Sequence, residues 1–239
     1  METAPVCILA GGLGSRLGEA VKDTPKPLLD VAGEPFLMHQ LRLLAAYGTH
    51  RVVLCVGYLG EQIEDAIGYS QFDMEVEYSY DGPELVGTLG AIRRAVPLLG
   101  ERFLTLYGDT YLRVDFRAFD ESWRASGLPG AMTVLHNHDR WGPSNAVFSN
   151  GLVTQFDKRR PTPNMEWIDY GLGGLETTAL DMVGPEATDL AALHQSLAQR
   201  GSLFGFEATH RFYEIGTPAS LEETEQFLLR QRRDEATVR

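Results

Sequence analysis

Hydrophobic residues in the first half of the chain fall into short segments separated by helical stretches. Three continuous apolar runs and one segment that alternates apolar and polar residues predict strands at 6–10, 51–56, 102–106 and 74–80. The stretches between them predict helices at 35–47, 60–67 and 88–98. Strands that alternate with helices at this spacing indicate βαβ units and a mainly parallel sheet.

The second half of the chain continues with shorter elements and contains no repeat or linker. Further strands are expected at 131–136, 152–157, 168–175 and 203–207, and further helices at 116–126, 189–200 and 220–232. A polar segment that contains prolines, KRRPTPNME at 158–166, predicts a loop. The fold class expected is therefore α/β, a Rossmann-like sheet flanked by helices, in one domain over residues 1–239.

Composition narrows the choice of partners. The net charge of −12 argues against nucleic acid, because binding to its backbone depends on clustered lysines and arginines. No stretch approaches the roughly 20 apolar residues of a membrane helix, and residues 1–5 lack the regions of a secretory signal. We expect a cytoplasmic protein without membrane contact, in which Cys7 and Cys55 are buried thiols rather than a disulfide.

A glycine-rich motif follows the first predicted strand: VCILAGGLGSRLGEAVKDTPKPLL, from Val6 to Leu29. Such turns hold phosphates, because glycine lets backbone N–H groups approach an anion closely. Two familiar phosphate loops do not fit this sequence. A P-loop requires a glycine followed by lysine, which is missing here, and a dinucleotide loop requires a third glycine where this chain has Leu17.

Two cations of the motif are suited to phosphate. Arg16 can donate paired hydrogen bonds to phosphate oxygens. Pro25 and Pro27 fix their own backbone and restrict the residue before each, so Lys26 is held on a stiff segment that cannot join a regular helix. A solvated lysine in a surface turn is the alternative, but the glycine loop beside it favours a cation presented to a phosphoryl group.

Together with later segments, the motif resembles the sugar-1-phosphate nucleotidyltransferases, also called NDP-sugar pyrophosphorylases. The similar segments occur in order along most of the chain: LAGGLGSRL, KDTPKPLLDVAGEPFL, VVLCVGYLGEQIED, GTLGAI, LYGDTYL, IDYGLGGL and FYEIGTP. The resemblance implies a fold of nucleotidyltransferase type that converts an NTP and a sugar 1-phosphate into an NDP-sugar and pyrophosphate, with Mg²⁺. It divides the domain into a nucleotide-binding half, 1–112, and a smaller sugar-phosphate-binding half, 113–239.

The same resemblance assigns roles at the nucleotide. Arg16, Lys26 and Asp109 are implied to be catalytic, and Asp109 and Glu214 to hold the metal, although many relatives have aspartate in place of Glu214. The residues alone leave Asp109 equally open to capping a turn. The implied nucleotide-binding residues are Leu9, Ala10, Gly11, Gly12, Gly14, Ser15, Arg16, Lys26, Gly87, Thr88 and Gly108.

For the sugar phosphate, the resemblance implies Lys158, Asp169, Gly171 and Glu176. Lys158 matches a lysine that contacts the phosphate, with a solvated basic loop as the alternative. Asp169 and Gly171 match positions that hold sugar hydroxyls, and relatives often have asparagine where this chain has Asp169. His136 and His138 are two apart on a predicted strand, where side chains alternate faces, so we expect no zinc site.

The sequence predicts the type of reaction more narrowly than it predicts the nucleobase and the sugar. The first motifs resemble guanylyltransferases in particular, which favours GTP with a heptose-like or mannose-like 1-phosphate. Uridylyl or cytidylyl transfer to another sugar phosphate, including muramic-type sugars, is the alternative. A nucleotide-sugar-dependent glycosyltransferase or a nucleotide sensor are rivals of other classes, and the former usually has D-x-D where this chain has Asp109, Thr110 and Tyr111. A homo-oligomer is compatible with the sequence.

Overall fold

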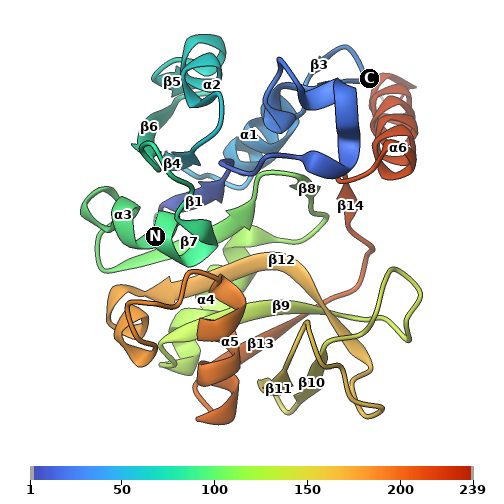
Figure 1. Cartoon of the computed structure of the whole chain (residues 1–239). Coiled ribbons are helices and arrows are strands. Elements are labelled where there is room, and N and C mark those ends of the chain that lie inside the picture. Colours follow the sequence, from blue (N-terminus) through green and yellow to red (C-terminus); the bar gives the residue numbers. More distant parts are fainter. Residues whose placement is uncertain (1–2, 238–239) are drawn as a thin grey trace.

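One continuous sheet of ten strands runs through the molecule, with helices on both of its faces (Figure 1). This computed structural model describes residues 3–237, and the side chains of all of these except 19, 20 and 235–237. The strands, from one edge of the sheet to the other, are β10 (Ala146–Ser149), β11 (Leu152–Phe156), β13 (Leu203–Ala208), β9 (Gly130–His136), β12 (Trp167–Glu176), β7 (Arg102–Tyr107), β1 (Val6–Leu9), β4 (Arg51–Val56), β6 (Met74–Tyr80) and β5 (Ser70–Gln71).

Shorter elements complete the fold. Two small sheets pair β2 (Asp30–Val31) with β3 (Glu34–Pro35), and β8 (Thr110–Tyr111) with β14 (Tyr213–Glu214). The α-helices are α1 (Phe36–Ala46), α2 (Gly60–Ile67), α3 (Gly87–Leu99), α4 (Phe116–Ser126), α5 (Leu190–Gln199) and α6 (Pro218–Thr237). The 3-10 helices are η1 (Ser15–Val21), η2 (Lys26–Leu28) and η3 (Thr177–Met182). Among the described residues, every helix is too short or too polar to be a membrane-spanning candidate.

The α/β class is confirmed, but the sheet is parallel only in part. β7, β1, β4 and β6 run parallel, as expected for βαβ units. β12 is antiparallel to both β7 and β9, and β10 and β11 form an antiparallel hairpin. The prediction of a mainly parallel sheet is therefore right for the four central strands of the first half and only partly right for the second. There β9 and β13 are parallel, but β10, β11 and β12 follow one another without a crossover helix.

Helices cover both faces of the central strands. In β1, Val6 and Ile8 face a core shared with α1, α2 and α4, while Cys7 faces a second core shared with α3 and α5. Burial on both faces explains why these strands are continuous apolar runs rather than alternating segments. Cys7 and Cys55 are buried free thiols, as predicted.

The end of the described chain returns to its beginning. In Figure 1, β14 and α6 run from the second half back toward α1 and β3. Phe227 of α6 stacks on Tyr213 with ring centroids 3.9 Å apart, and Glu225 accepts a hydrogen bond from the Ala32 N–H at 3.2 Å. The division at 112 and 113 stays a prediction, since β7 and β12 pair across it, and residues 1, 2, 238 and 239 of the predicted domain lie outside the described residues.

Close packing of β12 on α4 gives a test of this core. A methyl group on Gly174 would lie 2.5 Å from Cε3 of the fully buried Trp123. We expect Gly174→Ala to lower the free energy of unfolding by about 1–3 kcal/mol, because the indole ring has to shift within a packed core. Urea unfolding measures the effect. Gly12→Ala is the matched control, since no atom lies within 4 Å of its methyl position, and equal losses in both variants would contradict the packing described here.

Candidate active site

A cavity of about 270 Å³ opens at the edge of the sheet where the parallel strands end. Ligands bind at this edge in open α/β sheets. The cavity is lined by Leu9, Ala10, Gly11, Gly12, Gly14, Lys26, Pro27, Cys55, Asp81, Leu85, Gly87, Thr88, Ala91, Tyr107, Gly108 and Asp109. The structure therefore brings most of the predicted nucleotide-binding residues together, from four segments of the chain.

The ends of β1 and β7 approach each other too closely for side chains. A Cβ atom on Gly108 would lie 2.8 Å from the Leu9 carbonyl oxygen, and the Gly108 N–H donates to that oxygen at 3.0 Å. Gly14 has φ +64°, a conformation that side chains disfavour. These glycines keep the floor of the cavity made of backbone groups, which suits a bound phosphate.

Lys26 and Asp109 form an ion pair inside the cavity. The Lys26 Nζ and the Asp109 Oδ2 atoms are 2.5 Å apart, and Lys26 is only 9% exposed. Lys26 begins the short helix η2 between its two prolines, so its backbone cannot adjust freely. The alternative of a solvated surface lysine is wrong.

A buried glutamine holds the turn that carries Asp109. The Gln40 Nε2 atom, on α1, donates to the backbone oxygens of Tyr107 at 2.9 Å and Thr110 at 2.8 Å. The Thr110 hydroxyl donates to Asp109 Oδ1 at 3.0 Å. No pattern in the sequence indicated this role of Gln40, because it is one polar residue within an ordinary helix.

The second predicted carboxylate lies beside the first. Glu214 pairs with Thr110 across β14 and β8, and the Ile215 N–H donates to the Asp109 carbonyl oxygen at 3.0 Å. A Cβ atom on Gly216 would lie 3.2 Å from an Arg16 nitrogen and 3.4 Å from Glu214 Oε1. Arg16 and Glu214 therefore approach the same point, next to the turn of Asp109.

Two neighbouring carboxylates suit Mg²⁺, which uses few protein ligands and keeps waters or phosphates for the rest. Asp109 and Glu214 would supply the protein oxygens. Within residues 3–237 there is no cluster of three or more histidine, cysteine, aspartate or glutamate side chains that would hold a metal by itself. The donor set thus fits an ion bound jointly with a phosphate ligand.

The side chains of Lys158 and Asp169 form an ion pair next to Tyr107, which lines the cavity. The Lys158 Nζ atom is 2.8 Å from Asp169 Oδ2 and 3.4 Å from the Tyr107 hydroxyl. Burial alone lowers the pKa of Lys158, but Asp169 and Tyr107 outweigh it and raise the pKa above its usual range. Burial likewise raises the pKa of Asp169, and the Lys158 ammonium and the hydrogen bonds to the carboxylate more than reverse this, so the pKa is lowered and the carboxylate is ionised.

A bulge in β12 presents this carboxylate. The pairing of β12 with β9 shifts register between Asp169 and Gly173, and Gly171 has φ +107° there. The Gly171 N–H donates to Asp169 Oδ1 at 3.0 Å. Bulges re-aim side chains beside active sites, and this one turns Asp169 toward Lys158.

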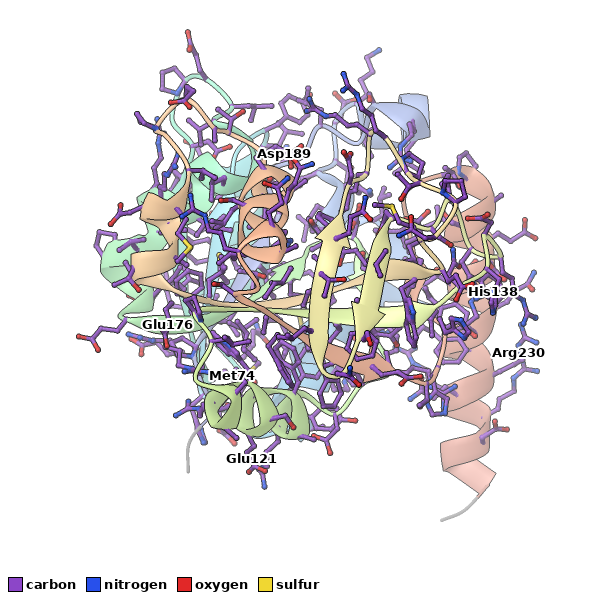
Figure 2. All side chains as sticks on the ribbon, turned by 90° about the horizontal axis from the view of Figure 1, so that it is seen from below. Met74, Glu121, His138, Glu176, Asp189 and Arg230 are labelled. Atoms are coloured by element: carbon purple, nitrogen blue, oxygen red, sulfur yellow. The ribbon has the colours of Figure 1, made fainter. Side chains whose placement is uncertain are left out.

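Glu176 is not part of the site, contrary to the sequence prediction. It pairs with Arg102 at the start of β7, with 3.3 Å between Arg102 Nη1 and Glu176 Oε1. Strand rise separates it from Asp169 by roughly 20 Å. Figure 2 shows Glu176 at the margin of the molecule, away from Asp189, which borders the same hollow as Lys158.

The prediction that His136 and His138 point to opposite faces is also wrong. Their ring centroids are 4.0 Å apart, and His136 stacks on Trp167 at 4.6 Å. Alternation in fact places residues two apart on the same face of a strand, so the prediction misapplied the rule. β9 also ends at His136, and His138 lies in a turn with φ +45°.

Sequence reasoning missed Asp81, which borders the glycine loop. It is 5% exposed, and its Oδ2 atom lies 3.2 Å from the Cβ position of Gly11. Burial raises the pKa of Asp81. Its position directly after the strand β6 is the signal that was available, the same signal that singled out Asp109. Ser15 and Arg16 lie on η1 with exposed side chains, at the rim rather than on the floor.

Several known proteins are similar to this chain in sequence or in fold. Residues 6–163 match the model of the MobA-like NTP transferase domain. The chain is 41% identical over 229 residues, 91% of its length and 95% of the relative's, to an N-acetylmuramate alpha-1-phosphate uridylyltransferase of Neisseria meningitidis. It is 31% identical over 152 residues, 64% of its length and 67% of the relative's, to a D-glycero-alpha-D-manno-heptose 1-phosphate guanylyltransferase of Campylobacter jejuni.

Among solved structures, a putative glucose-1-phosphate thymidylyltransferase from Bacillus anthracis superposes with a TM-score of 0.84, at 20% identity and 94% coverage of both chains. At this identity the likeness concerns the fold alone. The sequence matches, the cavity and the placement of the glycine loop lead to one conclusion. The chain belongs to the MobA-like NTP transferase domain family and, within it, to the sugar-1-phosphate nucleotidyltransferases.

Proposed function

We propose that this enzyme transfers a uridylyl group from UTP to an N-acetylmuramate-type sugar 1-phosphate, with release of pyrophosphate. The observation that carries the choice of substrates is the 41% identity, over 91% of the chain, to the uridylyltransferase of Neisseria meningitidis. An acidic sugar also agrees with the arginines, Arg159 and Arg160, that directly follow Lys158 and are exposed. GTP with a heptose-like or mannose-like 1-phosphate is the second candidate, supported by the heptose guanylyltransferase relative.

The proposed reaction needs alignment and charge neutralisation more than covalent catalysis. A phosphate oxygen of the sugar attacks the α-phosphorus of the NTP, and the bond to the β-phosphate oxygen breaks, so pyrophosphate leaves with the electron pair. The acceptor is already an anion, so no protein nucleophile or base is required. Arg16 and Lys26 bind and orient the triphosphate, and Lys158 holds the sugar phosphate at the other side of Tyr107.

The metal would lie between Asp109 and Glu214. When bound, Mg²⁺ neutralises phosphate charge and stabilises the charge that develops on pyrophosphate. Asp109 and Glu214 would hold the ion, and Lys26 would add a positive charge from the floor of the cavity. The exposed Arg16 is free to close over the phosphates from the rim.

A substrate panel tests the proposal. The purified protein with Mg²⁺ is incubated with each NTP against N-acetylmuramate, heptose, mannose and glucose 1-phosphates, and pyrophosphate release is measured. UTP with N-acetylmuramate 1-phosphate should have the highest kcat/KM. A preference for GTP with heptose or mannose 1-phosphate would favour the second candidate. Nucleotide binding without pyrophosphate release from any pair would refute nucleotidyl transfer.

Asp109→Asn removes one negative charge and keeps the shape of the side chain. We expect kcat to fall at least about 100-fold, as happens when a charge-stabilising group is lost at a phosphoryl centre. Circular dichroism should show an intact fold. Asp65→Asn, at an exposed position on α2, is the control and should leave kcat unchanged. Activity near the wild-type level in folded Asp109→Asn would exclude Asp109 as a metal ligand.

Lys158→Met tests the acceptor end separately. The KM for the sugar 1-phosphate should rise at least about tenfold, the loss of one charge-assisted contact, while the KM for the NTP stays within about twofold. Because the variant leaves the buried Asp169 unpaired, Lys158→Met with Asp169→Asn is made alongside it to keep the fold stable. Arg117→Met, exposed on α4, controls for general charge loss. An equal rise of both KM values would place Lys158 outside the sugar-phosphate contacts.

A further inference from the structure

His194 is a buried titratable residue with no role in the proposed reaction. It lies on the inner face of α5, is 3% exposed, and meets the ring of Phe156 edge-on at 5.8 Å between centroids. Neither of its ring nitrogens has a hydrogen-bond partner among the described protein groups. A leucine or phenylalanine would pack here without the free-energy cost of unpaired polar atoms. We therefore expect the imidazole nitrogens to have a hydrogen-bond partner other than a described protein group.

A small cavity of about 10 Å³ lies between His194 and the acceptor end of the site. Its walls include Thr105, Tyr107, Asp169 and Gly173. This volume is at the lower limit for one water molecule, which needs roughly 10–15 Å³ and two to four polar partners. The polar residues among those that line it include Thr105, Tyr107, Asp169 and His194.

Gly173 keeps this space clear. A Cβ atom on Gly173 would lie 2.6 Å from Thr105 Oγ1 and 3.7 Å from His194 Nε2. Any side chain at 173 would therefore push between the hydroxyl and the imidazole. The glycine therefore leaves the small cavity open, where a side chain would otherwise fill it. This cavity is called the chamber below.

The charge states of the two groups suit a hydrogen bond. Burial lowers the pKa of His194 to about 4, with Asp169 opposing the shift, so the ring is neutral at physiological pH and has one donor and one acceptor nitrogen. Asp169 already accepts from the Gly171 N–H and from Lys158 Nζ. A carboxylate has room for a further donor, and His194 can supply it through one water.

We propose that His194 is a positioning residue for the acceptor end of the site. One buried water in this chamber links the neutral imidazole to Asp169, and Asp169 in turn holds the Lys158 ammonium beside Tyr107. The inference rests on the proposed role of Lys158 in binding the sugar phosphate. Lys158 is long and its side chain is 38% exposed, so a fixed carboxylate at 2.8 Å is the strongest restraint on its orientation.

The kinetic test compares three variants of the full chain. His194→Phe keeps a ring but removes both nitrogens, and it should raise the KM for the sugar 1-phosphate about tenfold, with kcat and the KM for the NTP within about twofold. His194→Gln keeps a donor and an acceptor and should restore most of the loss. Leu197→Met, buried one turn further along α5, controls for repacking and should change neither KM.

Two kinetic outcomes would overturn the inference. The first is an unchanged KM for the sugar 1-phosphate in folded His194→Phe, because the His194 ring nitrogens would then be dispensable. The second is an equal change of the KM for the sugar 1-phosphate in His194→Phe and Leu197→Met, because α5 would then act through packing alone.

A high-resolution crystal structure of the wild-type protein gives a readout that is independent of turnover. We expect one ordered water within hydrogen-bond distance of a His194 nitrogen and of Asp169. A dry chamber would overturn the inference even in an active enzyme. If no substrate pair reacts, the proposed function is refuted. The electron density in the cavity would still show whether a water links His194 to Asp169.

Discussion

The ion pair of Lys26 and Asp109 is the constraint around which the rest of the site is arranged. It joins residues 83 positions apart, one on a proline-flanked segment and one at the end of a central strand. Lys26 needs this partner, because a buried ammonium without one is strongly destabilising. The pair therefore fixes the proline-flanked segment against the edge of the sheet. Arg16 approaches the same edge from η1, and Glu214 approaches it from the returning C-terminal segment.

β7 connects this ion pair to the acceptor end of the site. It is parallel to β1 and antiparallel to β12, so it belongs to both parts of the mixed sheet. Tyr107, its last residue, has its backbone oxygen held by Gln40 and its hydroxyl 3.4 Å from Lys158. A shift of β7 would thus disturb both the nucleotide and the sugar phosphate, which suits a reaction that requires two anions to be aligned.

Local sequence predicted the regular elements well. β4, β6, α2 and α4 have the predicted bounds to the residue, because continuous apolar runs and helical spacing carry a strong local signal. β10 and the two-residue strands were missed, since their pairing depends on partners distant in the chain. The error on the mainly parallel sheet has the same origin: strand direction is set by connections, and loops rather than helices join β10 to β11 and β11 to β12.

The sequence by itself determined the family, the glycine loop, the proline-flanked lysine and the aspartate in the turn after β7. Glycine, proline and a carboxylate after a strand act through local backbone geometry, which the order of residues specifies. Only the tertiary structure placed Glu176 away from the site and brought Asp81, Gln40 and His194 to it. Those assignments depend on strand length, on a bulge in β12 and on burial, which are properties of the assembled sheet rather than of any single segment.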